Sequence, residues 1–159
     1  MARKQKKEGG RSAYDTALAY LTPKARTVRE VELKLDEGCY SEGEIMQTIE
    51  RLQAAGILND EKYASDFVES RLRTKPVSRF RLSEQLRGHY VPDDVIDAAL
   101  RAVPDDTEFE NARAVAEKYM RQFDKMDDEE EKRRRVYARL RTRGFSHETI
   151  TAVMREPEE

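Results

Sequence analysis

One spacing of apolar residues occurs three times along this chain and constrains its fold more than any other feature. Apolar residues follow a leucine after five, ten and fourteen positions, and the sixth position suits a helix start. Successive copies lie 51 and 54 residues apart. A fixed period of this length indicates a repeat architecture, in which each unit needs its neighbours to bury its apolar faces. The copies comprise Leu35, Tyr40, Ser41, Ile45 and Ile49; Leu86, Val91, Pro92, Ile96 and Leu100; and Leu140, Phe145, Ser146, Ile150 and Met154, with Val31, Leu82 and Val136 four residues before each leucine.

Helix start and stop signals divide each copy into three helices. In the first copy Ser12 can cap one helix, Pro23 ends it, and Thr27 begins the next, because Thr27 and Glu30 have the capping-box spacing. Gly38 fits the end of that second helix, and Ser41 with Glu44 has the capping-box spacing at the start of the third. In the middle copy Ser78 can cap the second helix. These signals predict a disordered basic arm over 1–11, followed by three-helix repeats over 12–56, 57–104 and 105–159, the last with a frayed C-terminal tail.

The composition suits an all-α array better than one spherical core. Hydrophobic residues make up 38% of the chain and charged residues 39%, which is polar for a single core but acceptable for an elongated helical array. Only 7 glycines and 5 prolines occur, and no run alternates with period two, so strands find little support. Whether the three triplets form one mass or an open curved rod stays open at this point.

The same composition bounds the compartment and the chemistry. One cysteine excludes an internal disulfide, and neither a signal segment nor an apolar run of about 20 residues is present, so we expect a soluble, cytoplasmic monomer without a membrane span. Two isolated histidines make no metal site. Because no phosphate-binding glycine loop, HExxH or nucleophile elbow occurs, we expect no enzyme and no cofactor.

Two basic stripes lie on a molecule whose net charge is only −2. Such asymmetry favours a polyanionic partner, and arginine suits both the carboxylates of a protein and phosphates. A solvated face without a partner is the alternative. The middle basic stripe consists of Arg71, Arg73, Lys75, Arg79, Arg81 and Arg87, and the third-repeat stripe consists of Arg134, Arg135, Arg139, Arg141 and Arg143.

Within the third-repeat stripe, Arg135, Arg139 and Arg143 are four residues apart and would form one ridge along a helix. Like charges at this spacing cost a few tenths of a kcal/mol each. A ridge of three therefore favours a neutralising partner, although Glu131 could neutralise Arg135 internally.

Aromatic residues at helical spacing indicate a buried core rather than a surface on which bases stack, and we also expect Phe80 to be buried with the leucines of its helix. The aromatic pairs are Tyr63 with Phe67 and Tyr119 with Phe123.

Three segments of the chain resemble the RecX family of recombinase regulators, over roughly Ala13 to Arg155. The most specific segment runs GILNDEKYASDFVESR from Gly56 to Arg71 and continues to Arg81-Leu82 and Leu86-Arg87. The second is LRTRGFS over 140–146, with Ile150 following, and the third is ARTVREVELKL over 25–35. In the third, Val28 and Val31 replace the commoner polar and leucine residues.

The resemblance implies a crescent of three tandem three-helix repeats that lies in the helical groove of the RecA filament on DNA. There it would inhibit ATP hydrolysis, filament extension and strand exchange, and so modulate DNA repair and recombination. The implied partner is the RecA filament, with at most weak, non-specific contact to DNA. The alternative is a stand-alone DNA-binding protein that uses its helix-turn-helix-like units, and the residues alone leave it open.

Overall fold

Helices make up all the regular structure of residues 10–155, the part of the chain that this computed structural model describes. Most of the predicted arm over 1–11 and the tail after Arg155 lie outside this range. Repeat 1 contains α1 (Ala13–Leu21), α2 (Val28–Glu37) and α3 (Glu42–Ala54); repeat 2 contains α4 (Asp60–Thr74), α5 (Arg79–Gly88) and α6 (Asp93–Arg101); repeat 3 contains α7 (Thr107–Gln122), α8 (Glu129–Thr142) and α9 (His147–Arg155).

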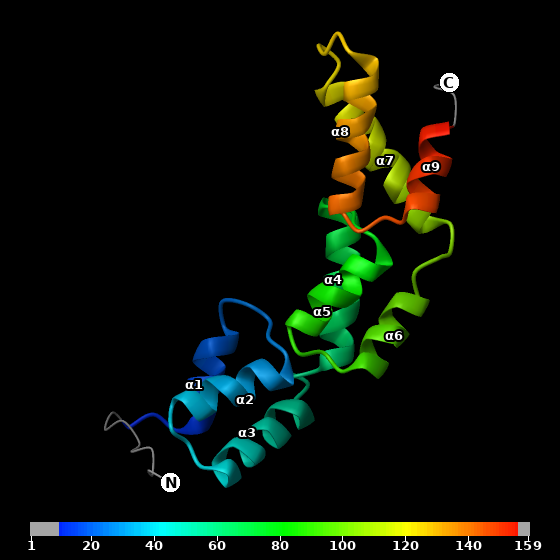
Figure 1. Cartoon of the computed structure of the whole chain (residues 1–159). Coiled ribbons are helices and arrows are strands. Elements are labelled where there is room, and N and C mark those ends of the chain that lie inside the picture. The colour runs from blue at the N-terminus through cyan, green and yellow to red at the C-terminus, as the bar shows by residue number, and fades with distance from the viewer. Residues whose placement is uncertain (1–9, 156–159) are drawn as a thin grey trace, which may run out of the picture.

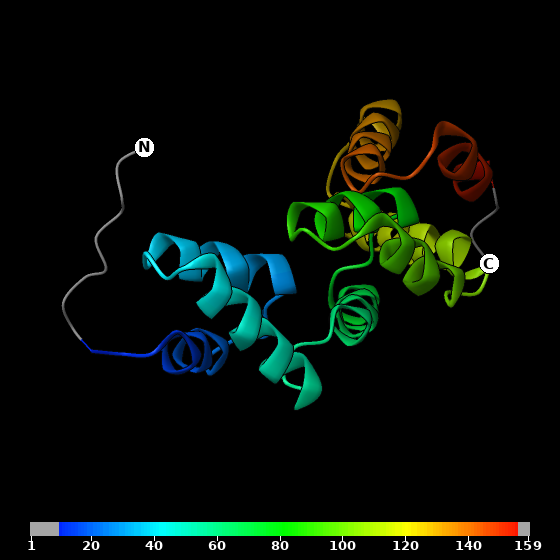
Figure 2. The same ribbon diagram turned by 90° about the horizontal axis from the view of Figure 1, so that it is seen from below.

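The three repeats follow one another along a bent rod rather than forming a single mass. Figure 1 shows repeats 2 and 3 stacked end to end, with repeat 1 offset to one side at the base of α4. The view from below in Figure 2 again separates repeat 1, in blue and cyan, from the green and orange helices. The expectation of an all-α, elongated and curved array of three three-helix repeats is confirmed.

Each repeat buries its own apolar core. The three core clusters correspond to the three repeats, and helices that pack extensively on each other always belong to the same repeat. Leu58, which the sequence places in repeat 2, packs in the core of repeat 1 because the chain turns back against α3 before α4 begins. Phe80 was wrongly expected in the core: it lies on the outer face of α5 and is 63% exposed.

The recurring spacing is explained by one turn used three times. The second helix of each repeat ends in a residue with left-handed backbone: Cys39, Tyr90 and Gly144 have φ of 62°, 62° and 88°. The next residue donates its N–H to the carbonyl of the leucine five positions earlier, as in Tyr40 to Leu35 (3.2 Å) and Phe145 to Leu140 (3.2 Å). This is the Schellman arrangement. It places the side chain of the leucine and the side chain of the residue that donates the N–H against the core.

The left-handed position corrects one expectation from the sequence. Gly38 was expected to supply the helix-ending conformation, but its φ is −75° and Cys39 takes that position instead. Other local predictions are confirmed. Thr27 with Glu30 and Ser41 with Glu44 form complete capping boxes, and Ser12 caps α1. Local sequence therefore determines where helices begin and end within each repeat, while the apolar residues of the turn fix how the helices pack.

Candidate functional site

Polar contacts join each repeat to the next, and the first of these joints lies between α2 and repeat 2. The contacts of joint 1–2 come from the start of α2, where Thr27 is completely buried. Its hydroxyl donates to the carbonyl of His89, in the turn after α5, at 2.7 Å. The Val28 N–H donates to the Asp60 carboxylate, in the first turn of α4, at 3.0 Å. An uncapped helix N–H and a buried hydroxyl are thus both satisfied by the following repeat.

Joint 2–3 repeats this arrangement 51 residues further along the chain. The Ser78 N–H donates to the carbonyl of Arg143, in the turn after α8, at 3.0 Å. The Arg79 N–H donates to the Glu108 carboxylate, in the first turn of α7, at 3.1 Å. Ser78 and Arg79 are the counterparts of Thr27 and Val28, so both joints insert the start of a second helix between the same two elements of the next repeat.

Two arginines strengthen joint 2–3 by binding carbonyls of the neighbouring repeat, and a third, Arg79, binds carbonyls at the end of its own repeat. Arg143 is only 8% exposed and donates to the Pro76 carbonyl at 2.9 Å and to the Tyr119 hydroxyl at 3.2 Å. Arg81 donates to the Thr142 carbonyl at 3.2 Å, across the same joint. Arg79 donates to the Val103 carbonyl at 2.7 Å and also binds the Pro104 carbonyl. Arg81 and Arg143 therefore hold repeats 2 and 3 together, and all three of these members of the predicted stripes bind within the fold.

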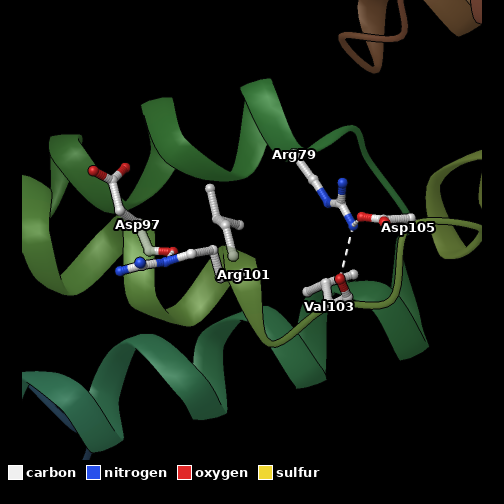
Figure 3. Close-up of a pocket in the computed structure, with 6 residues that line it drawn as sticks. Arg79, Asp97, Arg101, Val103 and Asp105 are labelled. Atoms are coloured by element: carbon white, nitrogen blue, oxygen red, sulfur yellow. Dashed lines mark hydrogen bonds and ion pairs between the residues drawn. The ribbon is translucent and has the colours of Figure 1, made fainter.

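The surroundings of Arg79 form a shallow hollow of about 490 Å³. Figure 3 shows Arg79 turned toward Val103 and Asp105, while Asp97 and Arg101 lie together along α6. Asp105 lies 3.5 Å from the Arg79 guanidinium. Because the Arg79 and Arg101 guanidinium groups of this hollow already bind backbone carbonyls, the hollow offers no free set of cationic ligands.

The rest of the middle basic stripe lies on the surface. Arg71 stacks 5.2 Å over the ring of Phe67, and Arg87 lies 3.2 Å from Asp93. Arg73 and Lys75 are exposed, and no acidic residue in the part of the chain described pairs with them.

The third-repeat stripe is not the continuous ridge that the helical spacing predicts. Arg143 is buried in joint 2–3, so the ridge ends at Arg139. Arg135 and Arg134 lie 3.2 and 2.8 Å from Glu131, and so the internal neutralisation foreseen for Arg135 occurs. Arg141 is exposed, although its guanidinium reaches the Phe145 carbonyl at 3.4 Å.

Three cations surround the ring of Tyr119, on α7. Arg139, Lys118 and Arg143 lie 5.5, 5.8 and 5.8 Å from its centroid. The hydrogen bond from Arg143 is the main cause that lowers the pKa of the Tyr119 hydroxyl, and the charges of all three cations act in the same direction, against partial burial. Tyr119 still packs against the core of repeat 3, as the sequence predicts. We name Lys118, Tyr119, Arg139 and Arg143 the Tyr119 cluster.

The remaining chemistry-bearing residues contribute to structure. His89 packs against Tyr63 and Phe67 and lies 3.6 Å from Glu30, while His147 pairs with the Tyr137 hydroxyl at 2.7 Å. Residues 10–155 contain no group of acids, cysteines and histidines that could hold a metal ion. Within the same residues, no helix has the length and apolar character needed to cross a membrane.

Sequence reasoning missed the joints, although it noticed the period that could reveal them. Thr27 and Ser78 occupy the same position of successive repeats, and both were interpreted only as helix caps. Their second role depends on a contact with the next repeat, which no local pattern encodes. Lys118 was missed for a similar reason: it belongs to neither stripe in sequence and reaches the cations of α8 only because α7 packs on that helix.

Comparison with family models assigns the three repeats one by one. A model of the first three-helix domain of RecX matches residues 13–52, one of the second domain matches 59–100, and one of the third domain matches 106–154. The matches occur in the order of the family and cover most of the chain.

Known RecX proteins are similar to this chain along nearly its whole length. Regulatory protein RecX of Prosthecochloris aestuarii is 30% identical over 146 residues, covering 92% of this chain and 93% of the relative. Regulatory protein RecX of Trichlorobacter lovleyi is 33% identical over 138 residues, covering 86% and 90%. The crystal structure of RecX from Lactobacillus salivarius has a TM-score of 0.77 and 27% identity, covering 89% of this chain and 92% of that one.

Proposed function

The chain belongs to the RecX family of regulatory proteins, and on that premise we propose that it inhibits a RecA-type recombinase by binding the filament that the recombinase forms on DNA. Bound there, it would suppress ATP hydrolysis, filament extension and strand exchange, and so modulate DNA repair and recombination. The observation that carries the proposal is the presence of all three family domains, in order, in one elongated array.

An elongated array supports this proposal because successive repeats can contact successive subunits of a filament. Binding across neighbouring subunits would hold them in an arrangement unfit for hydrolysis or for admitting duplex DNA. For the contact surface we propose the exposed cations of the two stripes, since Arg79, Arg81 and Arg143 already bind carbonyls within the fold. The proposed contacts are Arg71, Arg73, Lys75, Arg87, Arg134, Arg135, Arg139 and Arg141.

Sequence-specific DNA reading by helix-turn-helix units is less well supported. In such units the last helix enters the major groove and presents residues to base edges. In repeat 2 that helix is α6, and its exposed residues include Asp93, Asp94 and Asp97. In repeat 1 it is α3, with Glu42 and Glu50 exposed. Carboxylates on these faces would repel phosphates, so we prefer the recombinase as the principal partner.

DNA-stimulated ATP hydrolysis by the cognate recombinase tests the proposal directly. The rate is measured with increasing amounts of this protein, and we expect inhibition when the protein is present at amounts comparable to the recombinase subunits. An unchanged rate at stoichiometric amounts would contradict the proposal. Substituting Arg73 and Lys75 by Gln should weaken inhibition without changing the melting temperature, because both side chains are exposed.

A further inference from the structure

We propose that the Tyr119 cluster binds the phosphate groups of a nucleic-acid strand, without regard to base sequence. This goes beyond the regulation of a recombinase, because it assigns a ligand to one place on the isolated chain: the edge of joint 2–3, where α7 and α8 meet the end of α4.

The cluster is already organised for an anion before any ligand arrives. One end of the Arg143 guanidinium is fixed on the Pro76 carbonyl, and the other end donates to the Tyr119 oxygen at 3.2 Å. Because that oxygen accepts from Arg143, the phenolic proton is available for a further acceptor. Lys118 and Arg139 lie over the same ring and are both exposed, so a ligand can reach them from solvent.

Among residues 10–155, no acid neutralises these cations. Arg134 and Arg135, on the same helix, both pair with Glu131. By contrast, no carboxylate in the range 10–155 pairs with Lys118, Arg139 or the buried Arg143. The hydrogen bond from Arg143, and after it the charges of the three cations, lowers the pKa of the Tyr119 hydroxyl. Like charges held this close are unfavourable unless an external anion offsets them.

A phosphodiester backbone fits this arrangement better than a single protein carboxylate. The donors are of three kinds, a phenol, an ammonium and a guanidinium, and approach from α7 and from α8. A tetrahedral phosphate accepts donors from several directions, whereas a planar carboxylate is best matched by one guanidinium fork. Lys75, a further cation without an acidic partner in residues 10–155, directly precedes Pro76, whose carbonyl binds Arg143. A nucleic-acid strand carries one charge on every nucleotide and can therefore contact several such cations in series.

The test uses the full-length chain with a fluorescein-labelled single strand of thirty thymidines and no recombinase. Binding is measured by fluorescence anisotropy at several salt concentrations for the wild type, for the K118Q/R139Q double variant and for a matched control, K34Q/R51Q. The control removes the same two kinds of cation from over tyrosine rings of repeat 1, where Lys34 lies 5.5 Å from Tyr20 and Arg51 lies 3.9 Å from Tyr14. Melting curves check that each variant remains folded.

Losing two phosphate contacts should make the slope of log K against log[salt] shallower by about 1.4, at roughly 0.7 per contact on a single strand. At 50 mM salt the K118Q/R139Q affinity should fall about tenfold or more by the same relation, while K34Q/R51Q should keep the wild-type slope. Equal slopes in the two double variants would overturn the proposal. So would displacement of wild-type protein from DNA by poly-glutamate at lower charge concentration than by unlabelled strand, since the site would then prefer carboxylates.

A second readout follows the hydroxyl itself. With 3-fluorotyrosine placed only at position 119, its ionisation can be titrated by ¹⁹F NMR with and without the strand. A phosphate beside the ring disfavours the phenolate, so binding should raise the pKa of this residue toward its ordinary value. An unchanged titration in the presence of saturating strand would contradict contact at this site. Because recombinase is absent, either negative result leaves the proposed inhibition of ATP hydrolysis untouched.

Discussion

Joint 1–2 and joint 2–3 use the same positions of the repeat but differ in how many polar groups they connect. Joint 1–2 relies on the Thr27 hydroxyl, the Val28 N–H and the half-buried pair of His89 with Glu30. Joint 2–3 has contacts at the same two positions, from the N–H groups of Ser78 and Arg79, and adds arginine side chains that bind carbonyls of both repeats. Hydrogen bonds to charged groups contribute about 1.5–3 kcal/mol each when buried. We therefore expect joint 2–3 to be the stiffer of the two.

The difference bears on how a filament binder can fit its partner. A stiff pair of repeats provides a fixed spacing between two contact regions, while a lighter joint lets repeat 1 adjust its direction. The end of the array is built differently again. The position that begins α2 and α5 falls at Arg133 in repeat 3, but α8 already begins at Glu129, one turn earlier. The backbone N–H of Arg133 is therefore used inside α8 rather than in a joint.

The largest effect should come from Gly144→Ala, which breaks joint 2–3. A Cβ at Gly144 would overlap Ser78 Oγ and lie 2.8 Å from Arg81 Cβ, and φ is +88° there. The left-handed backbone costs roughly 1–2 kcal/mol and the overlap about 1–3 kcal/mol more, so we expect unfolding to become easier by about 2–5 kcal/mol. Urea denaturation measures this change.

The matched control is Tyr90→Ala, at the same position of the turn in joint 1–2. Tyr90 has the same left-handed backbone but is 53% exposed, so truncation should change the free energy of unfolding by at most about 1 kcal/mol. Equal losses in Gly144→Ala and Tyr90→Ala would mean that the two joints are packed alike, against the structure.

The next largest effect is expected from Arg143→Met. Methionine keeps much of the volume but leaves the part-buried Pro76 carbonyl without its donor, so we expect a loss of about 2–3 kcal/mol of stability. Arg87→Met is the control, because its ion pair with Asp93 is exposed and should be worth less than about 1 kcal/mol. If thermal melts of the two variants coincide, Arg143 does not hold the joint.

Thr27→Val tests the lighter joint and should have an intermediate effect. Valine is nearly isosteric but removes the hydroxyl that both caps α2 and binds the His89 carbonyl, so we expect a loss of about 1–2 kcal/mol. Thr27→Ser keeps the hydroxyl and should lose much less. Hydrogen exchange of the α2 amides follows the opening of the joint, and equal exchange in the Val and Ser variants would contradict a role for the hydroxyl.

Sequence reasoning succeeded within the repeats and failed at the joints between them. Within each repeat the signals are local, so the capping boxes at Thr27 and Ser41 and the buried Leu35, Leu86 and Leu140 were predictable. Contacts between repeats depend on residues between 29 and 67 positions apart, and Arg143 was accordingly placed on a surface ridge rather than in a joint. Helical periodicity alone could not correct this, because it assigns a residue to a face without saying what covers that face.

The same limit applied to the candidate site. The stripes were found by counting charges along the sequence, which detects arginines but not their partners. Glu131 could be foreseen as a partner because it lies four residues from Arg135 on one helix. The Pro76 and Thr142 carbonyls could not, since backbone acceptors leave no trace in composition. For Lys118 and Tyr119, only the packing of α7 on α8 brings the cluster together.

The smallest expected effect concerns Asp60, whose carboxylate accepts the Val28 N–H in joint 1–2 at 3.0 Å. Burial is the main cause that raises the pKa of Asp60 in the folded protein, and Glu61, Glu32 and Glu30 raise it further, whereas the Val28 hydrogen bond lowers it. The folded state therefore holds the proton more tightly than the unfolded state. Its contribution to stability is fully present below the unfolded pKa and is lost as pH rises through the folded pKa.

Asp60→Asn should remove this pH dependence while keeping the joint, because the amide oxygen can still accept from Val28. The difference in unfolding free energy, variant minus wild type, should become more positive as pH rises from about 4 toward 7, by at most about 0.5 kcal/mol since solvent screens a partly exposed carboxylate. Urea titrations at several pH values measure it, and other carboxylates cancel in the difference. Asp60→Ala should instead destabilise at every pH, because it leaves the α2 N–H without a protein acceptor. A difference for Asp60→Asn that stays constant with pH would show that the acids around Asp60 do not strain joint 1–2, and the weakness of that joint would then come only from its fewer hydrogen bonds.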